Sequence, residues 1–159
     1  MNSNKLTFVT FEPQNDHFKG FLSMEAVINH KGDMENLLHQ SVRLYDKYIK
    51  NIRHLIKDIQ LAKAERKPIA ARKIWEIGDI IFKLKFELEK ISLELDGLYD
   101  HLVRDLEVKQ KWLEKVVIFR RYISDKKKIP VSLNWGRCEK GTRRIAERLA
   151  KGLPIIDSK

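Results

Sequence analysis

The residues best suited to chemistry in this chain lie at the start of a predicted helix near position 110. The segment 110–123 has apolar residues at helical spacing, and polar side chains crowd its beginning. These side chains are Lys109, Gln110, Lys111 and Glu114. Glutamine can form two hydrogen bonds with adenine in the major groove of DNA, and lysine can reach guanine. Their types therefore suit a helix that reads base edges, whereas Arg120 and Arg121, further along, suit phosphate contact.

A second basic group follows, in a charged loop and at the start of a predicted last helix at residues 140–151. Cations are disfavoured at a helix N-terminus by the helix dipole, so an external anion such as phosphate would relieve them. Trp135 beside them suits base stacking, but its place after a loop favours a core role. The predicted nucleic-acid-binding residues are therefore Lys109, Gln110, Lys111, Arg120, Arg121, Lys126, Lys127, Lys128, Arg137, Lys140, Arg143, Arg144 and Arg148.

The positive charge of the chain is concentrated in its last third. Residues 104–159 carry 16 Lys and Arg against 7 Asp and Glu, whereas residues 1–103 carry 16 against 15. A polyanion-binding surface has this kind of charge excess, because contacts with phosphates supply much of the affinity for nucleic acids. A solvated lysine-rich surface is the alternative explanation.

The sequence offers no set of residues for catalysis or for binding a metal or cofactor. The five histidines are scattered, Cys138 has no partner at a zinc-ligand spacing, and no glycine-rich phosphate loop occurs. Asp105, Glu107 and Lys109 superficially match part of a metal-dependent nuclease motif. On a helix, however, Glu107 and Lys109 would point in nearly opposite directions. We therefore predict a protein that is not an enzyme and that needs no cofactor or metal.

Length and composition suggest one highly charged helical domain, or a compact domain with an extension. The chain has 159 residues, of which 43% are hydrophobic and 34% are charged. No uncharged stretch approaches the length of a membrane helix, and the N-terminus lacks the pattern of a secretion signal. A single cysteine excludes an internal disulfide and fits a reducing compartment. We therefore expect a cytoplasmic protein without a membrane partner.

The elements that must position the basic residues begin with two long helices. In both, apolar residues recur at steps of mostly 3 and 4, which is a heptad pattern. The first seam is Leu38, Val42, Tyr45, Ile49, Ile52, Ile56 and Ile59, and the second is Ile74, Ile77, Ile81, Leu84, Leu88, Ile91, Leu95 and Leu98. Asp33 is a candidate N-cap, residues 64–67 end the first helix, and Pro68 can open the second. The seams predict an antiparallel hairpin, closed within one monomer or in a homodimer.

The predicted fold is all-α, with three parts packed as one domain. Residues 1–32 form an N-terminal arm with a short strand or extended segment at residues 5–13. Residues 33–98 form the helical hairpin, and residues 99–159 form a basic bundle of short helices. Within this bundle, the turn at residues 107–109 joins two helices into a helix-turn-helix-like pair. Residues 133–136 form a turn, and Gly152 suits the C′ position that ends the last helix.

Short motifs spread over residues 74–149 carry a resemblance to a known family. They are Ile74-Trp75-Glu76-Ile77-Gly78 with Ile80-Ile81, then Leu102 to Leu106, Trp112-Leu113 with Phe119 and Tyr122, Leu133-Asn134-Trp135, and the Arg143-Arg144 helix. This pattern resembles the helical N-terminal domain of YhcG-type proteins, which precedes a PD-(D/E)XK nuclease domain. That family has serine where this chain has Asn134. The resemblance implies a DNA-binding role in mobile-element, restriction or phage-defence systems, and it implies no cleavage because the nuclease half is missing.

Charge and helical pattern together favour a nucleic-acid-binding protein with duplex DNA as its preferred ligand. An RNA-binding or ribonucleoprotein subunit would have a similar composition. A helical protein-interaction module, whose basic end meets an acidic partner, is the third interpretation. Competition between duplex DNA, structured RNA and single strands would separate the first two, and a protein partner that copurifies without nucleic acid would favour the third.

Overall fold

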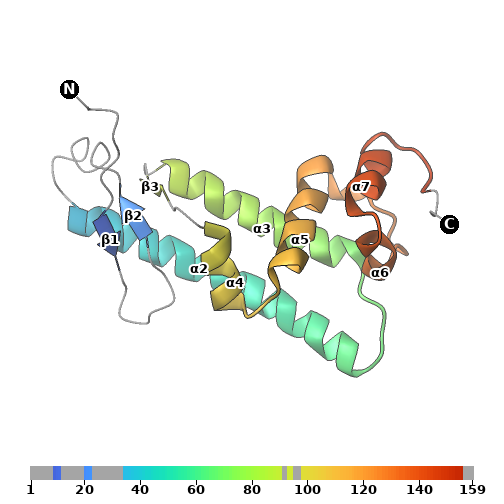
Figure 1. Ribbon diagram of the computed structural model, residues 1–159, viewed down its shortest axis with the longest axis horizontal. Helices are drawn as coiled ribbons and strands as arrows, with labels where there is room; N and C mark the ends of the chain where they lie inside the picture. Colours follow the sequence, from blue (N-terminus) through green and yellow to red (C-terminus); the bar gives the residue numbers. More distant parts are fainter. Residues whose placement is uncertain (1–8, 12–19, 23–33, 91–92, 95–97, 156–159) are drawn as a thin grey trace. The chain divides into compact units, whose positions relative to one another are not determined.

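The computed structural model of the chain describes residues 9–11, 20–22, 34–90, 93–94 and 98–155 (Figure 1). Its helices are α2 (Met34–Ala64), α3 (Ala71–Lys90), α4 (Leu98–Leu106), α5 (Gln110–Tyr122), α6 (Trp135–Glu139) and α7 (Thr142–Ala150). A 3-10 turn, η1 (Lys126–Lys128), follows α5. The fold is all-α, as the sequence predicts. Within the described part, no helix has both the length and the apolar character needed to cross a bilayer.

Three short strands form a small antiparallel sheet in the order β1-β2-β3. The strands are β1 (Val9–Phe11), β2 (Gly20–Leu22) and β3 (Leu93–Glu94). β1 lies inside residues 5–13, where the sequence predicts a strand or an extended segment. The central strand places Phe21 opposite Thr10 of β1 and Glu94 of β3.

The predicted second helix is too long at its C-terminal end. α3 ends at Lys90, β3 pairs with β2, and Leu98 begins the separate helix α4. The sequence Ile91-Ser92-Leu93-Glu94-Leu95 alternates apolar and polar residues, so it suits a strand as well as a heptad. Pairing with a strand far away in the sequence decides between the two.

The chain divides into two compact units, each of which combines part of α2 with part of α3. Unit 1 comprises residues 1–50 and 82–108, so it contains the sheet and α4. Unit 2 comprises residues 51–81 and 109–159, so it contains α5, η1, α6 and α7. These divisions cross the hairpin and do not follow the predicted boundaries at residues 32 and 98. The reason is that antiparallel helices bring residues far apart in sequence to the same level.

The predicted heptad seams form the core of both units. In unit 2 the buried seam residues of α2 are Ile52, Ile56 and Ile59, and those of α3 are Ile74, Ile77 and Ile81. In unit 1 they are Tyr45, Ile49, Leu84 and Leu88. An ion pair between Lys73 and Asp58, with Nζ 3.4 Å from Oδ2, joins the two helices in unit 2. The side chains of Leu38 and Val42, and residues Asp33, Ile91 and Leu95, lie outside the described residues.

The link between α2 and α3 departs from the prediction that Pro68 opens the second helix. α2 ends at Ala64 as expected, but α3 begins at Ala71. Between them, Ala70 pairs with Asn134 in an isolated antiparallel bridge. The N–H of Ala71 donates to the carbonyl of Leu133 at 2.9 Å, and the N–H of Trp135 donates to the carbonyl of Ile69 at 2.8 Å. The backbone of the residues just after Pro68 forms hydrogen bonds with this distant segment. These residues are therefore extended instead of helical.

Near the C-terminus, where the same pairing occurs, the structure also differs from the prediction. Residues 133–136 do not form a simple turn, because Trp135 begins the short helix α6. The predicted last helix is also divided, since α6 ends at Glu139 and α7 begins at Thr142. α7 packs against both α5 and α6, which confirms a bundle of short helices.

Three helices end in the same hydrogen-bonded motif. A residue one or two positions past the end has a positive φ in each case: Arg66 after α2 (55°), Glu107 after α4 (53°) and Gly152 after α7 (70°). After α7, the N–H of Leu153 donates to the carbonyl of Arg148, as a Schellman motif requires. The C′ role predicted for Gly152 is confirmed. Arg66 and Glu107 adopt the same backbone at a cost of roughly 1 kcal/mol, because each has a Cβ.

Gly78 allows α3 and α5 to approach closely. A Cβ built at this buried glycine would lie 2.6 Å from Cβ of Arg120 and 3.0 Å from the carbonyl oxygen of Val116. Both distances are too short for ordinary packing, and the atoms belong to the body of α5. The absence of a side chain at position 78 therefore sets the separation of the two helices.

We predict that Gly78→Ala destabilises the protein by about 1–3 kcal/mol, because the added methyl forces α5 away from α3. Alanine favours helices by about 1 kcal/mol over glycine, so the clash must exceed that gain. Urea unfolding followed by circular dichroism measures the change. The matched control is Gly136→Ala in α6, where a Cβ meets nothing within 4 Å, so this variant should be equally or more stable. Equal stability of both variants would contradict the close approach.

Candidate nucleic-acid interface

Helix α5, which carries the predicted base-reading residues, is anchored to α3 by a largely buried ion pair. Nε of Arg120 donates to Oδ1 of Asp79 at 2.9 Å, and both side chains are only 17% exposed. The guanidinium lies over the ring of Trp75, with Cζ 5.0 Å from the centroid. The indole N–H of Trp75 donates to the carbonyl of Ile123 at 2.7 Å. These contacts hold the C-terminal half of α5 in one orientation on α3.

The segment after α5 is held by the same helix. Nζ of Lys126 lies 3.1 Å from Oε1 of Glu76, and Nε of Arg72 donates to the carbonyl of Ile129 at 2.7 Å. The side chain of Asp125 caps η1 by accepting a hydrogen bond from the N–H of Lys127 at 3.0 Å. α3 therefore sets the path of the chain from α5 toward α6.

Trp135 belongs to the core of unit 2, as the preferred sequence interpretation predicts. It is 1% exposed, and its ring meets Phe119 edge to face with the centroids 5.3 Å apart. Cys138, one turn further along α6, is fully buried. Burial raises the pKa of the Cys138 thiol from 9.0 to about 12, because a thiolate would lose its hydration. Neither side chain is available to a surface ligand.

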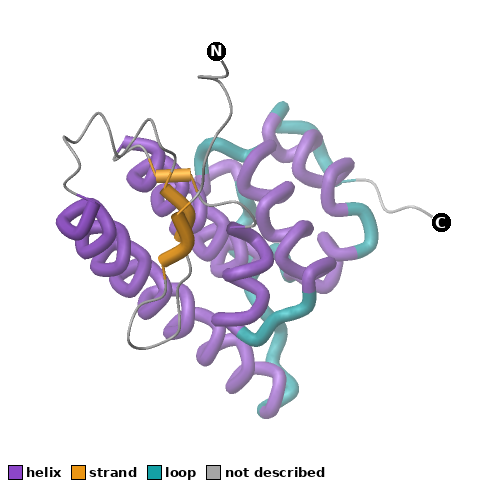
Figure 2. The backbone as a smooth tube through the Cα atoms, turned by 60° about the vertical axis from the view of Figure 1, so that its left-hand side comes forward, coloured by secondary structure: helices purple, strands orange, loops and turns teal. Residues whose placement is uncertain are grey.

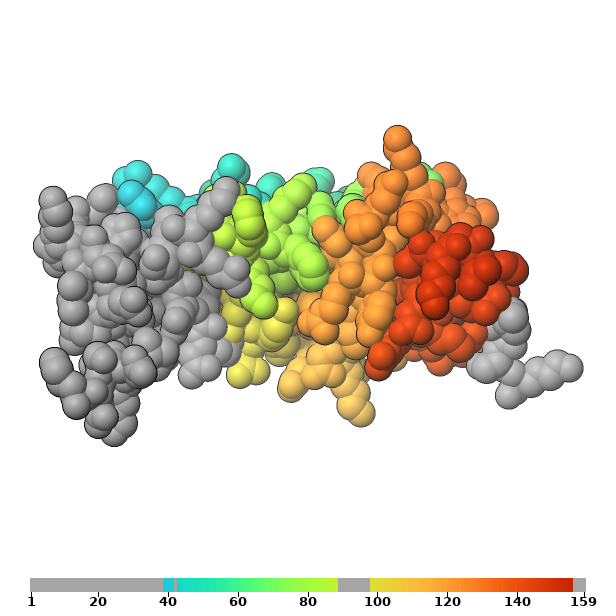
Figure 3. Space-filling view, turned by 90° about the horizontal axis from the view of Figure 1, so that it is seen from above, coloured from blue at the N-terminus to red at the C-terminus, as the bar shows by residue number. Residues whose placement is uncertain are grey.

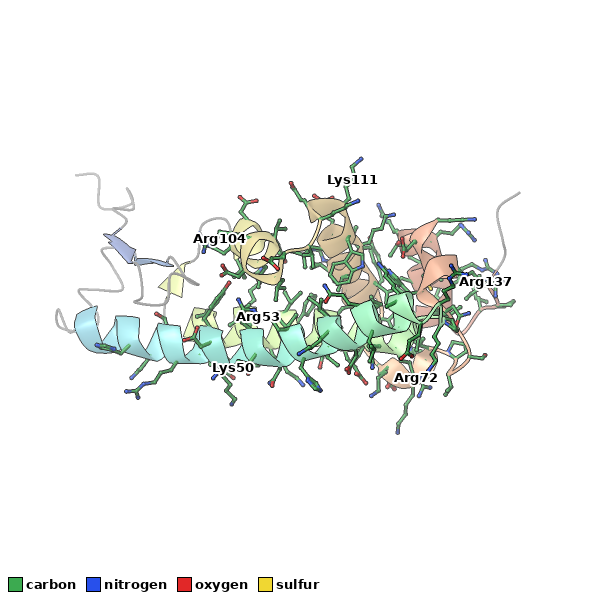
Figure 4. The ribbon with its side chains drawn as sticks, turned by 90° about the horizontal axis from the view of Figure 1, so that it is seen from below. Lys50, Arg53, Arg72, Arg104, Lys111 and Arg137 are labelled. Atoms are coloured by element: carbon green, nitrogen blue, oxygen red, sulfur yellow. The ribbon has the colours of Figure 1, made fainter. Side chains whose placement is uncertain are left out.

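The first turn of α5 is exposed and strongly basic. Lys109, Gln110 and Lys111 are all exposed, and the turn has no acidic residue. The Gln110 amide donates to Glu114 at 3.3 Å. Lys109 and Lys111 make no ion pair with any other described residue, and Lys111 projects outward from unit 2 (Figure 4). This end of α5 is therefore open to an anionic partner.

A second cluster of cations lies at the start of α7. Arg143 is the best defined of them, because its guanidinium lies over the ring of Tyr122 with Cζ 5.5 Å from the centroid. Nε of Arg143 also bonds Oε1 of Glu147 at 3.2 Å, and its side chain stays 71% exposed. Lys140 is exposed, and the first turn of α7 has no acidic residue. The contact with Tyr122 joins α7 to α5, and Figure 3 shows the two helices side by side in unit 2.

The structure divides the thirteen predicted residues into two groups. The exposed ones are Lys109, Gln110, Lys111, Arg121, Lys127, Lys128, Arg137, Lys140 and Arg143, and the partly buried ones are Arg120, Lys126, Arg144 and Arg148. Arg120 and Lys126 are each paired with an acid of α3. Among the thirteen predicted residues, the exposed cations outside any ion pair or internal hydrogen bond of their side chains with described residues are Lys109, Lys111, Arg121, Lys127 and Lys140.

The charge of the chain follows its two units. Unit 2 contains 22 Lys and Arg against 9 Asp and Glu, a net charge of +13. Unit 1 contains 10 against 13, a net charge of −3. The two units differ more in net charge than residues 1–103 and 104–159 do. The reason is that the part of the hairpin that belongs to unit 2 has its own excess of cations. The basic residues still point in several directions, since Arg72 and Lys111 face opposite sides of unit 2 (Figure 4).

The predicted helix-turn-helix pair is present as two helices in succession. α4 ends at Leu106, α5 begins at Gln110, and Glu107 supplies the turn. α4 belongs to unit 1, however, and α5 to unit 2. Packing of the two as a helix-turn-helix therefore stays a prediction, as does homodimerisation.

The residues that superficially match a nuclease motif have structural roles. Asp105 is buried, and its carboxylate accepts a hydrogen bond from the hydroxyl of Tyr45 and another from Nε of Arg104 at 3.0 Å. Glu107 forms the positive-φ turn, and Lys109 is the N-cap of α5. Over the described residues, no three or more His, Cys, Asp or Glu side chains cluster as metal ligands would.

The acids and the glycine of α3 that hold α5 and the segment after it are not among the site residues predicted from the sequence. Glu76 and Asp79 look like ordinary charged residues on the solvent face of a heptad helix. The usable signal was Gly78, because a glycine inside a strongly helical pattern marks a close approach by another segment.

We predict that Arg120 and its neighbour Arg121 differ in their effect on stability. Arg120→Gln should destabilise the protein by about 1–3 kcal/mol, because it removes the guanidinium that pairs with the largely buried Asp79 carboxylate. Arg121→Gln should change stability by less than about 0.5 kcal/mol, because Arg121 is exposed. Urea midpoints measure both. If the two variants unfold at the same midpoint, the anchoring role of Arg120 is wrong.

We also predict that Cys138 is chemically inert in the folded chain. A pKa raised from 9.0 to about 12 lowers the thiolate fraction roughly a thousandfold at pH 8, so a thiol reagent should react only after unfolding. The raised pKa also means that the thiol's contribution to stability is present below pH 9.0 and is lost as the pH rises toward 12. Labelling rates with and without urea test this, and rapid labelling of the native chain would contradict the burial.

Comparison with known proteins gives no match that would identify a relative of this chain. No family model matches the chain, and no curated protein or solved structure shows significant similarity to it.

Proposed function

We propose that this chain is a nucleic-acid-binding protein whose basic unit 2 contacts the phosphates of duplex DNA. The observation that supports the proposal most strongly is the net charge of +13 in unit 2 beside −3 in unit 1. Solubility alone requires charge, but it does not require opposite net charges in two units of one chain. A polyanion attracted to unit 2 would release its counterions on binding, and this release supplies a large part of the affinity for DNA.

The exposed start of α5 is the proposed base-reading element. In this proposal Gln110 exchanges its bond to Glu114 for adenine, and Lys111 reaches guanine or a nearby phosphate. Lys109 lies before the helix and suits phosphate contact. The C-terminal end of α5 is anchored on α3 through Arg120 and Asp79. The N-terminal end, which would read bases, is therefore fixed in place while its side chains stay exposed.

The start of α7 is the proposed phosphate-positioning element. Arg143 is held by Tyr122 on one side and by Glu147 on the other, so its guanidinium is partly oriented before any ligand arrives. Lys140 adds a cation without a competing acid partner. Arg120 and Lys126 are left out of the proposed surface, because their charges are used within unit 2.

The resemblance to the helical domain of YhcG-type proteins fits this proposal, and we retain it as part of the same hypothesis. The motif Ile74 to Gly78 contains Trp75 and Gly78, which seat α5 on α3. The corresponding role would be DNA binding.

The proposal predicts salt-dependent binding of a fluorescein-labelled DNA duplex. The logarithm of the binding constant should fall linearly with the logarithm of salt concentration, with a slope of about −0.9 per contacted phosphate. Lys109→Gln/Lys111→Gln should make the slope shallower by about two units and weaken binding of all sequences. Gln110→Ala should instead reduce the preference between sequences, because glutamine contacts a base. Fluorescence anisotropy measures each quantity.

The matched control removes two exposed lysines of unit 1, Lys50→Gln/Lys85→Gln. The control should keep the slope of the unchanged chain. No binding at about 50 mM salt, or equal slopes for the two double variants, would reject the proposal. If structured RNA displaces the duplex at lower concentration than competing DNA does, the ligand is RNA and the assignment to duplex DNA is wrong.

A further inference from the structure

The loop between α2 and α3 lies against the start of α6, and this contact extends the basic surface beyond the predicted site. Ala70 and Asn134 pair as an antiparallel bridge, and two backbone hydrogen bonds of 2.8 and 2.9 Å flank the pair. Both segments belong to unit 2. Figures 1 and 2 show the loop rising from the end of α2 to the bundle of short helices.

Basic residues lie on both sides of this bridge. We call them, with one amide, the hairpin-tip ridge: Lys63, Arg66, Lys67, Asn134, Arg137 and Lys140, all of which are exposed. Two acids lie in the same stretches, Glu65 and Glu139, and Glu65 is paired with Lys67 at 2.8 Å. Lys63 and Arg66 make no ion pair with any described residue. The ridge therefore keeps a net positive charge.

The surface around the bridge is also open to a polyanion. A Cβ at Gly136 would meet nothing within 4 Å, so no bulky group shields the start of α6. Asn134 is the N-cap of α6, but its side chain makes no capping hydrogen bond. Its amide is therefore available as a donor, and amides are common phosphate ligands in complexes with DNA.

The two sides of the ridge are close enough to contact one nucleic-acid segment. Lys67 lies two positions before Ile69, and Arg137 lies two positions after Trp135. With Cα atoms 3.8 Å apart along the chain and about 5.5 Å apart across a bridge, the Cα atoms of Lys67 and Arg137 lie within about 20 Å. One DNA strand presents a phosphate about every 3.4 Å along the helix axis, so this upper limit corresponds to about six nucleotides.

We infer that the hairpin-tip ridge is a second phosphate-binding surface of unit 2, with Lys63 and Arg66 as contacts that the charge of the sequence does not reveal. This inference rests on the proposed function, since it assigns further residues to the same nucleic-acid interface. In this inference the tip of the hairpin contacts the sugar-phosphate backbone.

The test compares two double variants of the full chain that each remove one lysine and one arginine. Lys63→Gln/Arg66→Gln changes the ridge, and Arg43→Gln/Lys85→Gln removes the same charges from exposed positions of unit 1. The ridge variant should make the salt slope for a labelled DNA duplex shallower by about two units and weaken binding roughly tenfold at 0.1 M salt. The unit 1 variant should leave the slope unchanged. Lys63→Arg/Arg66→Lys keeps both charges and should restore full binding.

The outcomes separate this inference from the proposed function. A parent chain that does not bind nucleic acid rejects both. A parent chain that binds, with a slope reduced by Lys109→Gln/Lys111→Gln but not by Lys63→Gln/Arg66→Gln, overturns the ridge alone. If the ridge variant has a lower urea midpoint than the parent, the single change Lys63→Gln replaces it, and its expected effect is a slope shallower by about one unit.

Discussion

The close approach of α3 and α5 is the constraint on which unit 2 depends. Gly78 has no side chain, so the body of α5 lies where a methyl group would otherwise be. This proximity lets Arg120 reach Asp79 and lie over the ring of Trp75. The ion pair is well shielded, so removing one partner would leave the other in a poorly hydrated place. One small residue and one paired cation thus determine how the C-terminal bundle is seated on the hairpin.

The seating of α5 also decides which cations remain available. Arg120 and Lys126 satisfy acids of α3, and their charges are therefore used to hold the unit together. Lys109 and Lys111 lie at the start of α5, Lys140 lies just before α7, and all three remain exposed. A basic sequence therefore contains two kinds of cation, one that organises the fold and one that a polyanion can reach. Only the second kind contributes to counterion release on binding.

The hairpin contributes to the charged surface as well as to the core. Its two halves belong to different units, so the average charge of residues 1–103 conceals a basic tip. Backbone pairing between Ala70 and Asn134 places that tip beside α6. The pairing also explains why α3 begins three residues after Pro68, since the intervening backbone is extended. A local start signal for a helix was overridden by hydrogen bonds to a segment more than sixty residues away.

The sequence by itself determined the all-α class, the buried seams of α2 and α3, the bounds of α5 and the C′ role of Gly152. These features depend on spacings of a few residues within one element, so local patterns carry them. Only the tertiary structure decided that α3 stops at Lys90, that the last helix is divided and that the cations have two roles. Those outcomes depend on partners 41 to 73 residues away, as in the contact of Arg120 with Asp79 and the pairings of Ala70 with Asn134 and of Phe21 with Glu94. Periodicity cannot encode such distances, because it records which face of an element is buried and not what lies against it.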